Sequence, residues 1–196
     1  MTIALEIPFD RIVQWLEEAK QQPQISEPTA IGLATANKSG QPSLRMVLLK
    51  GLDARGLTFF TNSESQKGGE LQENPQACLN FYWMPLGRQI RCTGRVEPVS
   101  EQESDKYFAS RRWGSRIASM ASDQSRPLAQ YKDYLDRVAA LEKEYEGKEP
   151  PRPKHWYGWR LIPQEIEFWQ EREFRMHHRE LYMREGEGWR SELRYP

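Results

Sequence analysis

Five short apolar segments rich in strand-forming residues follow one another between residues 29 and 99, mostly separated by turn-length connections. Such connections suit antiparallel neighbours, because a parallel pair needs a crossover of about a dozen residues or more. Turn sequences stand at Asn37–Gly40 and Asp53–Gly56, and one predicted short helix, Ser65–Glu73, interrupts the series. The pattern predicts an antiparallel α+β barrel. The predicted strands are Thr29–Ala36, Ser43–Leu52, Leu57–Asn62, Ala77–Met84 and Gln89–Val99.

Periodic apolar residues and capping signals predict four more helices. The first runs from Phe9 to Ala19 and ends before Pro23, and Ser100–Arg111 begins with a capping-box pattern. A short helix at Ser115–Ser122 precedes Pro127–Tyr145, which has the clearest helical period in the chain. We interpret residues 1–196 as one domain, with the N-terminal helix in 1–24 and the closing strands in 154–196. These strands are Trp159–Ile162, Ile166–Gln170, Glu180–Arg184 and Trp189–Arg194.

Bulk composition narrows the function classes. The 28 Lys and Arg residues balance the 28 Asp and Glu residues, so no overall field attracts nucleic acid or an anionic membrane. No apolar run approaches the roughly 20 residues of a membrane span, and Met1–Pro8 lacks a signal-peptide pattern, so we expect a cytoplasmic protein. Cys78 and Cys92 stand alone and are interpreted as ordinary buried thiols. Any anion site must therefore come from local clustering.

Side chains rather than a glycine-rich loop must hold any phosphate, because Gly68 and Gly69 follow Lys67 without Walker or dinucleotide spacing. Arg45 and Lys50 bracket an apolar strand. Residues five apart on a strand point to opposite faces, so we expect these two cations to serve different anions. Two strand-end residues that extend into water would give the same pattern.

Two further polar groups could bind anions. Thr61, Ser65, Gln66 and Lys67 lie at a strand-to-helix junction, where hydroxyls, a cation and a helix N-terminus can meet one phosphate, although an N-cap alone also accounts for Ser65. Further along, residues spaced four apart place a phenol, a guanidinium and a hydroxyl on one side of a helix end. A solvated helix end is the alternative there. The residues in this second group are Tyr107, Arg111 and Ser115.

The C-terminal segment concentrates cationic side chains. If 175–179 is extended, Arg175, His177 and Arg179 share one face, which is costly unless an anion or an electron-rich ring lies opposite. The adjacent His177 and His178 would diverge on a strand, and no third ligand stands at metal-site spacing. The segment therefore favours a binding site for an anion or an electron-rich ring over the alternative of a plain surface strand, and it predicts no metal site.

Taken together, the strand Arg45–Lys50, the pair Gln124 and Ser125, and the ending Glu167–Trp169 with Arg175, His177 and Arg179 resemble the pyridoxamine 5'-phosphate oxidase family. The resemblance extends from about Pro28 to Pro196. It implies an FMN-binding, Greek-key, antiparallel split barrel with flanking helices. It also implies a homodimer with two FMN clefts at the subunit interface, each taking residues from both chains.

The resemblance also implies a role for each matching residue. Arg175 and His177 match residues beside the pyridine ring, which we take as catalytic. Lys50, Tyr107, Arg111 and Ser115 match those that hold the substrate phosphate. Gln66 stands where many members carry arginine, so we expect weaker FMN binding than an arginine would give, because glutamine donates only a neutral hydrogen bond. The FMN-contact positions are Arg45, Met46, Val47, Leu48, Lys50, Phe60, Thr61, Gln66, Lys67, Gln89, Gln124, Ser125, Trp169 and Arg179.

The implied reaction is the oxidation of pyridoxamine or pyridoxine 5'-phosphate to pyridoxal 5'-phosphate, with hydride passing to FMN and O2 reduced to H2O2. The alternatives are a related flavoprotein, either a phenazine-pathway oxidase or a flavin reductase, and a non-catalytic binder of flavin or pyridoxal phosphate. The complete second set of phosphate-binding residues favours the oxidase, because a reductase needs no second phosphate site. His178 and the short segment before Phe9 depart from the family pattern on the substrate side.

Overall fold

The computed structural model describes residues 7–196, so the first six residues of the predicted N-terminal segment lie outside the described part of the chain. The described residues form one antiparallel sheet, ordered β2-β1-β5-β6-β7-β4-β3, with β8 paired to β7 and β9 paired to β8. The predicted antiparallel α+β architecture is confirmed. The strands are β1 Ala30–Ala36, β2 Pro42–Leu48, β3 Gly51–Asp53, β4 Gly56–Asn62, β5 Gln76–Trp83, β6 Arg88–Pro98, β7 Trp156–Gln170, β8 His178–Glu185 and β9 Gly188–Leu193.

Five α-helices accompany the sheet in the described residues, together with two short 3-10 turns. Ser65 caps α2 and accepts a hydrogen bond from the Gly68 amide, and the predicted capping box of Ser100 and Glu103 is confirmed at α3. None of the helices in 7–196 is long and apolar enough to cross a membrane. The helices are α1 Ile7–Lys20, α2 Gln66–Glu73, α3 Glu101–Ser110, α4 Trp113–Ala121 and α5 Tyr131–Glu144, and the turns are Met84–Leu86 and Glu173–Arg175.

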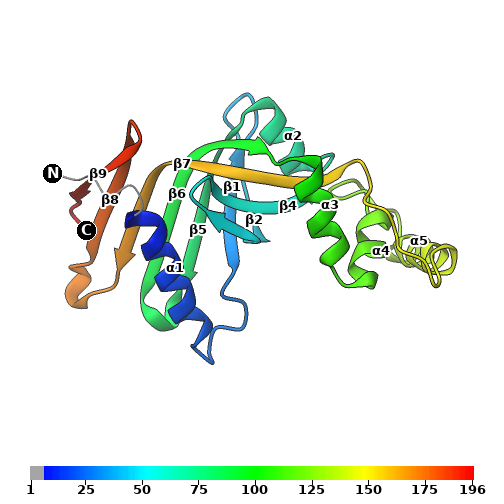
Figure 1. Cartoon of the computed structure of the whole chain (residues 1–196), viewed down its shortest axis with the longest axis horizontal. Helices are drawn as coiled ribbons and strands as arrows, with labels where there is room; N and C mark the ends of the chain where they lie inside the picture. The colour runs from blue at the N-terminus through cyan, green and yellow to red at the C-terminus, as the bar shows by residue number, and fades with distance from the viewer. Residues whose placement is uncertain (1–6) are drawn as a thin grey trace.

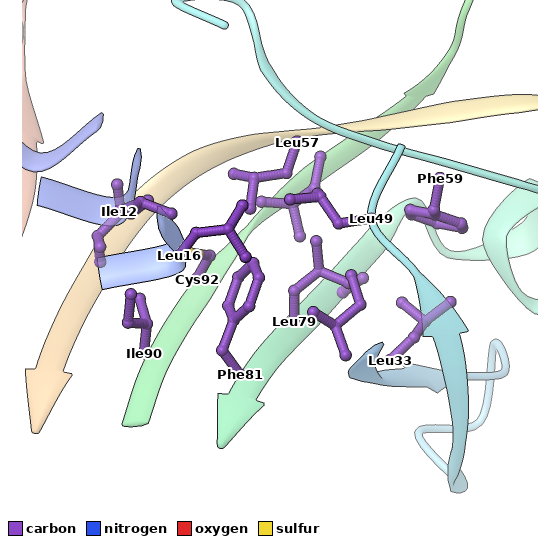
Figure 2. Packing of buried hydrophobic residues seen from close by; sticks show 14 of the residues in the cluster. Ile12, Leu16, Leu33, Leu49, Leu57, Phe59, Leu79, Phe81, Ile90 and Cys92 are labelled. Carbon is purple, nitrogen blue, oxygen red and sulfur yellow. The ribbon is translucent and has the colours of Figure 1, made fainter. Parts of the chain in front are cut away.

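The core fills the inside of the curved sheet, and α1 packs against one side of it. Figure 2 shows Ile12 and Leu16 of α1 directed toward Phe81 and Ile90 of the sheet, and all four side chains are buried. Burial of such apolar side chains stabilises the fold by about 1.5–3 kcal/mol for each one. Helices α3, α4 and α5 lie toward one end of the long axis, and β8 and β9 form the other end (Figure 1).

The long strand β7 corrects one prediction, because it joins two segments that were expected to be separate strands. It pairs with β6 along one edge, and on the other edge with β4 and then β8. Pro163 sits inside it, opposite Gly94, where the register shifts. Proline lacks an N–H and is tolerated at such bulges. A Cβ on Gly94 would lie 2.1 Å from the Ile162 carbonyl oxygen, so glycine allows the two backbones to approach.

The predicted strand Ser43–Leu52 is also wrong as a single element. β2 ends at Leu48 and β3 begins at Gly51, because the chain changes pairing partner from β1 to β4. Leu49 donates its amide to Thr29, whereas Lys50 donates to Thr58. The alternation of side chains between the two faces of β2 therefore does not extend from Arg45 to Lys50.

Three smaller predictions differ from the structure. α5 begins at Tyr131, not at Pro127, with Gln130 as its cap, and its apolar residues Tyr131 and Leu135 are exposed in the chain. The segment 175–179 is not a continuous strand, since only His178 and Arg179 belong to β8. Cys92 is buried as expected, but Cys78 is only half-buried.

Candidate active site

One cleft of about 1200 Å³ opens beside β2 and β4 and gathers most of the predicted site residues. Its walls come from β2, β4, the start of α2, the helices α3 and α4, and the segment after α4. This volume exceeds that of a typical small-ligand pocket, so the cleft can take a cofactor and a substrate together. The predicted residues that line it are Arg45, Met46, Val47, Leu48, Lys50, Phe60, Thr61, Gln66, Lys67, Tyr107, Arg111, Ser115, Gln124 and Ser125.

Lys67 is the buried cation of the cleft, with only 7% of the residue exposed. Its Nζ donates to Gln124 Oε1 at 2.7 Å, to Thr61 Oγ1 at 3.1 Å and to Ser65 Oγ at 3.2 Å. Burial lowers the pKa of Lys67 to about 8, and the charge of Arg45 adds to this effect. The ammonium is therefore held close to the N-terminus of α2, and no carboxylate of residues 7–196 forms an ion pair with it, which suits an anion-binding site.

Arg45 stands beside Lys67 and is fixed from behind the cleft wall. Its Nη1 donates to the Leu33 carbonyl oxygen at 3.2 Å, and its Nη2 donates to Glu70 Oε2 at 3.2 Å. The hydroxyls of Thr35 and Ser43 also accept hydrogen bonds from this guanidinium. These contacts within the chain fix the guanidinium of Arg45 in one geometry.

A stack of aromatic rings forms another part of the cleft. The centroid of the Phe60 ring lies 4.1 Å from that of Tyr107 and 5.4 Å from that of Trp156, and the interplanar angles are 25° and 12°. The Arg111 guanidinium carbon lies 4.8 Å from the Trp156 ring centroid, and Nη1 donates to Ser119 Oγ at 2.7 Å. Burial lowers the pKa of Arg111 and raises that of Tyr107. These contacts argue against the alternative of a freely solvated helix end.

Arg45 and Lys50 line the same cleft, although strand alternation placed them on opposite faces. The break between β2 and β3 explains the difference, because Lys50 is no longer part of the β2 ladder. The cations of the cleft nevertheless differ in the elements that hold them. Arg45 and Lys67 lie by α2, whereas Arg111 lies at the end of α3.

Five predicted site residues do not line the cleft and instead form what we call the C-terminal cluster. Gln89 of β6 pairs with Trp169 of β7, which in turn pairs with Arg179 of β8. The ring centroids of Trp169 and His177 are 4.6 Å apart. β8 lies at the end of the molecule away from α3 and α4 (Figure 1). The cluster consists of Gln89, Trp169, Arg175, His177 and Arg179.

The geometry of this cluster corrects the prediction that three cationic side chains share one strand face. Phe174 and Arg175 have left-handed φ values of 54° and 61° in a 3-10 turn, so strand alternation does not apply to them. The anion opposite Arg179 is internal: Nη2 and Nε donate to Glu167 at 2.9 and 3.1 Å. Burial tends to raise the pKa of Glu167, but Arg179 and Arg91 outweigh it and lower that pKa.

Several cleft residues were missed by the sequence reasoning. Trp156, Ser119 and Ser43 line the cleft, and each contacts a predicted residue. Glu70 lies behind the wall and receives hydrogen bonds from Arg45 and Gln66. The four-residue spacing of Gln66 and Glu70 on a helix was the one available signal for that contact.

The donors in the cleft fit FMN. Arg45 and Lys67, with the neutral donors around them, suit a phosphate dianion, and the apolar Met46 and Val47 can border a flat ring system. By contrast, residues 7–196 contain no group of three or more His, Cys, Asp or Glu residues placed to hold a metal ion.

Comparisons with known proteins agree with this geometry. Residues 17–169 match the family model described as pyridoxamine 5'-phosphate oxidase, and residues 156–196 match the pyridoxine 5'-phosphate oxidase C-terminal dimerisation region. The pyridoxine/pyridoxamine 5'-phosphate oxidase of Myxococcus xanthus strain DK1622 is 48% identical, with 96% of this chain and 91% of that protein covered. The enzyme of that name from Gluconobacter oxydans strain 621H is 47% identical, with 96% and 94% covered.

Two solved structures are similar in fold. PhzG from Burkholderia lata 383, in complex with tetrahydrophenazine-1-carboxylic acid, has a TM-score of 0.91 and 35% identity, with 96% of this chain and 92% of that chain covered. A pyridoxamine 5'-phosphate oxidase-related, FMN-binding protein from Nostoc punctiforme PCC 73102 has a TM-score of 0.78 and 17% identity, with both chains covered completely. At that identity the second likeness concerns the fold alone.

Proposed function

This chain belongs to the pyridoxamine 5'-phosphate oxidase family, and from that premise we propose that it is an FMN-dependent oxidase of pyridoxamine or pyridoxine 5'-phosphate. The product is pyridoxal 5'-phosphate, and O2 is the final electron acceptor. When bound, FMN supplies hydride acceptance from the substrate carbon and reoxidation by O2 to give H2O2.

The observation that carries this proposal is that two sets of cationic side chains, with different hydrogen-bond and ring partners, line one cleft. Lys67 stands in the first turn of α2, where a helix N-terminus favours a phosphate, and Arg45 of β2 is paired with Glu70 of the same helix. Arg111, held over Trp156 and by Ser119, provides a second cation near Tyr107 and Ser115. We assign the first group to the FMN phosphate and the second, with Lys50, to the substrate phosphate.

Substrate positioning is the main task of the second group. Arg111, Tyr107 and Ser115 hold the phosphate remote from the reacting carbon, so that binding energy there orients the pyridine ring for hydride transfer. Arg111 is already oriented by its contacts with Trp156 and Ser119, which reduces the ordering cost of binding.

Completion of the site requires a second chain. The C-terminal cluster lies away from the cleft and inside the segment that matches a dimerisation region. We assign Trp169 and Arg179 to FMN contacts in the partner's cleft, and Arg175 and His177 to the substrate ring there. In a two-fold dimer each chain would donate its cluster to the other chain's cleft. The guanidinium of Arg175 would then stabilise charge that develops on the substrate.

A second candidate is the oxidation of a phenazine-type carboxylic acid, which is favoured by the similarity to PhzG and its bound tetrahydrophenazine-1-carboxylic acid. That ligand carries a carboxylate, whereas the second group here is suited to a phosphate dianion.

One aerobic assay distinguishes the candidates. Purified protein with added FMN is incubated with pyridoxamine 5'-phosphate, and aldehyde and H2O2 are followed together, with unphosphorylated pyridoxamine and a tetrahydrophenazine carboxylic acid as comparison substrates. We expect equal yields of aldehyde and peroxide from the phosphorylated substrate and little from pyridoxamine. Turnover of the phenazine compound alone would favour the second candidate, and FMN binding without any turnover would indicate a store.

A further inference from the structure

Glu70 is a buried carboxylate at the cofactor end of the cleft, although it does not line the cleft itself. Its side chain is 8% exposed. Oε2 accepts hydrogen bonds from Ser43 Oγ at 2.6 Å, from Arg45 Nη2 at 3.2 Å and from the Thr35 hydroxyl. Oε1 accepts from Gln66 Nε2 at 2.9 Å. Three of these donors, on Ser43, Arg45 and Gln66, belong to residues of the cleft wall.

Glu70 is ionised throughout the neutral range. Burial by itself would raise its pKa, but the hydrogen bonds from Ser43, Thr35, Gln66 and Arg45 outweigh burial and lower the pKa to about 2. Arg45 is itself largely buried, and Glu70 is the carboxylate that pairs with it among the described residues. A buried guanidinium without a counter-ion is strongly unfavourable, so Glu70 stabilises Arg45 while no ligand phosphate is present.

We propose that Glu70 is the internal counter-ion of the cofactor phosphate site, which holds Arg45 and Gln66 in position before the phosphate binds and competes with the phosphate for them. This role deepens the proposed function, because it rests on FMN occupying the Arg45 and Lys67 end of the cleft. The carboxylate keeps the ligand-free protein stable. Because it lies behind Arg45 and carries the same sign of charge as the phosphate, it also weakens FMN binding.

The same contact determines what residue 66 can contribute. Gln66 and Glu70 are four residues apart on α2, and the amide of Gln66 is already donated to Glu70. An arginine at position 66 would place its guanidinium beside the Glu70 carboxylate. The guanidinium would then interact with both Glu70 and the phosphate, so its contribution to phosphate binding would be smaller than in the absence of the carboxylate. The gain in FMN affinity from Gln66→Arg is therefore larger in a Glu70→Gln background than in the native chain.

Glu70→Gln is the first test, since it removes the charge and keeps the shape. We expect the melting temperature of the apoprotein to fall by roughly 5–10 °C, while FMN binds roughly three- to tenfold more tightly in a fluorescence titration. Inorganic phosphate should raise the melting temperature of the Glu70→Gln apoprotein more than that of the native apoprotein. FMN affinity that is unchanged or weaker would overturn the proposal.

Glu103→Gln is the matched control. Glu103 accepts a hydrogen bond from Arg160, whose side chain is 8% exposed, and neither residue lines the cleft. This variant also leaves a buried guanidinium without its carboxylate, so it should lower stability and leave the affinity for FMN unchanged. A comparable gain in FMN affinity in Glu103→Gln would show that the effect of Glu70→Gln is not local, and the proposal would fail.

A double variant keeps the test decisive if Glu70→Gln does not fold. Replacing both charges, in Arg45→Gln with Glu70→Gln, should restore folding and a melting temperature above that of Glu70→Gln alone, because no unpaired charge remains. A double variant no more stable than the single one would contradict the counter-ion role. Native protein that binds no FMN would instead refute the proposed function, since the thermal comparison of these variants does not depend on FMN.

Discussion

In the cleft, Arg45, Lys67 and Arg111 are each held by hydrogen bonds or ring contacts within one chain. Left-handed backbone occurs in both regions, at Ser125 of the cleft and at Phe174 and Arg175 of the C-terminal turn, but the turn differs in leaving Phe174 86% exposed. Left-handed conformations of non-glycine residues are unfavourable and are found most often at functional sites. The cleft is therefore preorganised by its own chain. In the C-terminal cluster Arg179 is likewise held by Glu167, but the turn presents the exposed Arg175 outward, as a contribution to a second chain would require.

The largest expected effect is on the exposed region. Arg175→Ala should lower kcat by roughly 10²- to 10³-fold, because a donor that stabilises developing charge is lost. FMN affinity should change little, since this residue is assigned to the substrate ring. Steady-state kinetics with a parallel FMN titration measures both. A comparable loss of FMN affinity would indicate that Arg175 contacts the cofactor. The two regions would then not differ in the way described.

Arg111→Ala examines the preorganised region. A charge-assisted contact contributes about 1.5–3 kcal/mol, so KM for the phosphorylated substrate should rise by roughly 10- to 100-fold, with FMN retained. Ser119→Ala is the milder companion variant, because it removes only the hydrogen bond that orients Arg111. If Arg111→Ala released FMN as readily as substrate, the two anion groups of the cleft would not be separate.

Lys67 adds a pH dependence to the same region. Its folded pKa of about 8 lies below the ordinary 10.5, so the folded apoprotein binds fewer protons than the unfolded chain between these values, and its stability rises with pH across that window. A bound phosphate favours the protonated lysine, so FMN affinity should fall roughly tenfold from pH 7 to pH 9. In Lys67→Arg the charge persists and the pH profile should be flatter. If FMN affinity changed equally with pH in both proteins, Lys67 would not be part of the phosphate site.

The smallest effect is the most direct test of the two-chain arrangement. Arg111→Ala and Arg175→Ala protomers are dissociated, mixed and reassembled, and activity is measured at low substrate. If each site combines the cleft of one chain with the cluster of the other, mixed dimers have one intact site. The mixture should then reach about one quarter of native activity, several-fold above the unmixed average. Activity equal to that average would mean that both residues serve the same site from the same chain.

Much of the fold was predictable from local sequence. Turn residues and short apolar segments indicated antiparallel strands, and the capping box fixed the start of α3 at Ser100. The division of Ser43–Leu52 was not predictable, because it depends on the change of partner from β1 to β4. The fusion of two segments into β7 likewise required the register shift opposite Pro163, which is a property of the pair of strands and not of either sequence.

The sequence by itself determined the chemical types at the site and the family that they imply, because the motifs around Arg45, Lys67, Arg111 and Arg175 are local patterns of residue type. Only the tertiary structure decided which of them meet. It brought Arg45, Lys67 and Arg111 into one cleft, kept Arg175 outside it, and placed Glu70 behind Arg45. Distances between residues far apart in the chain depend on sheet pairing and packing, and these arise from the sum of many weak contacts that no single motif encodes.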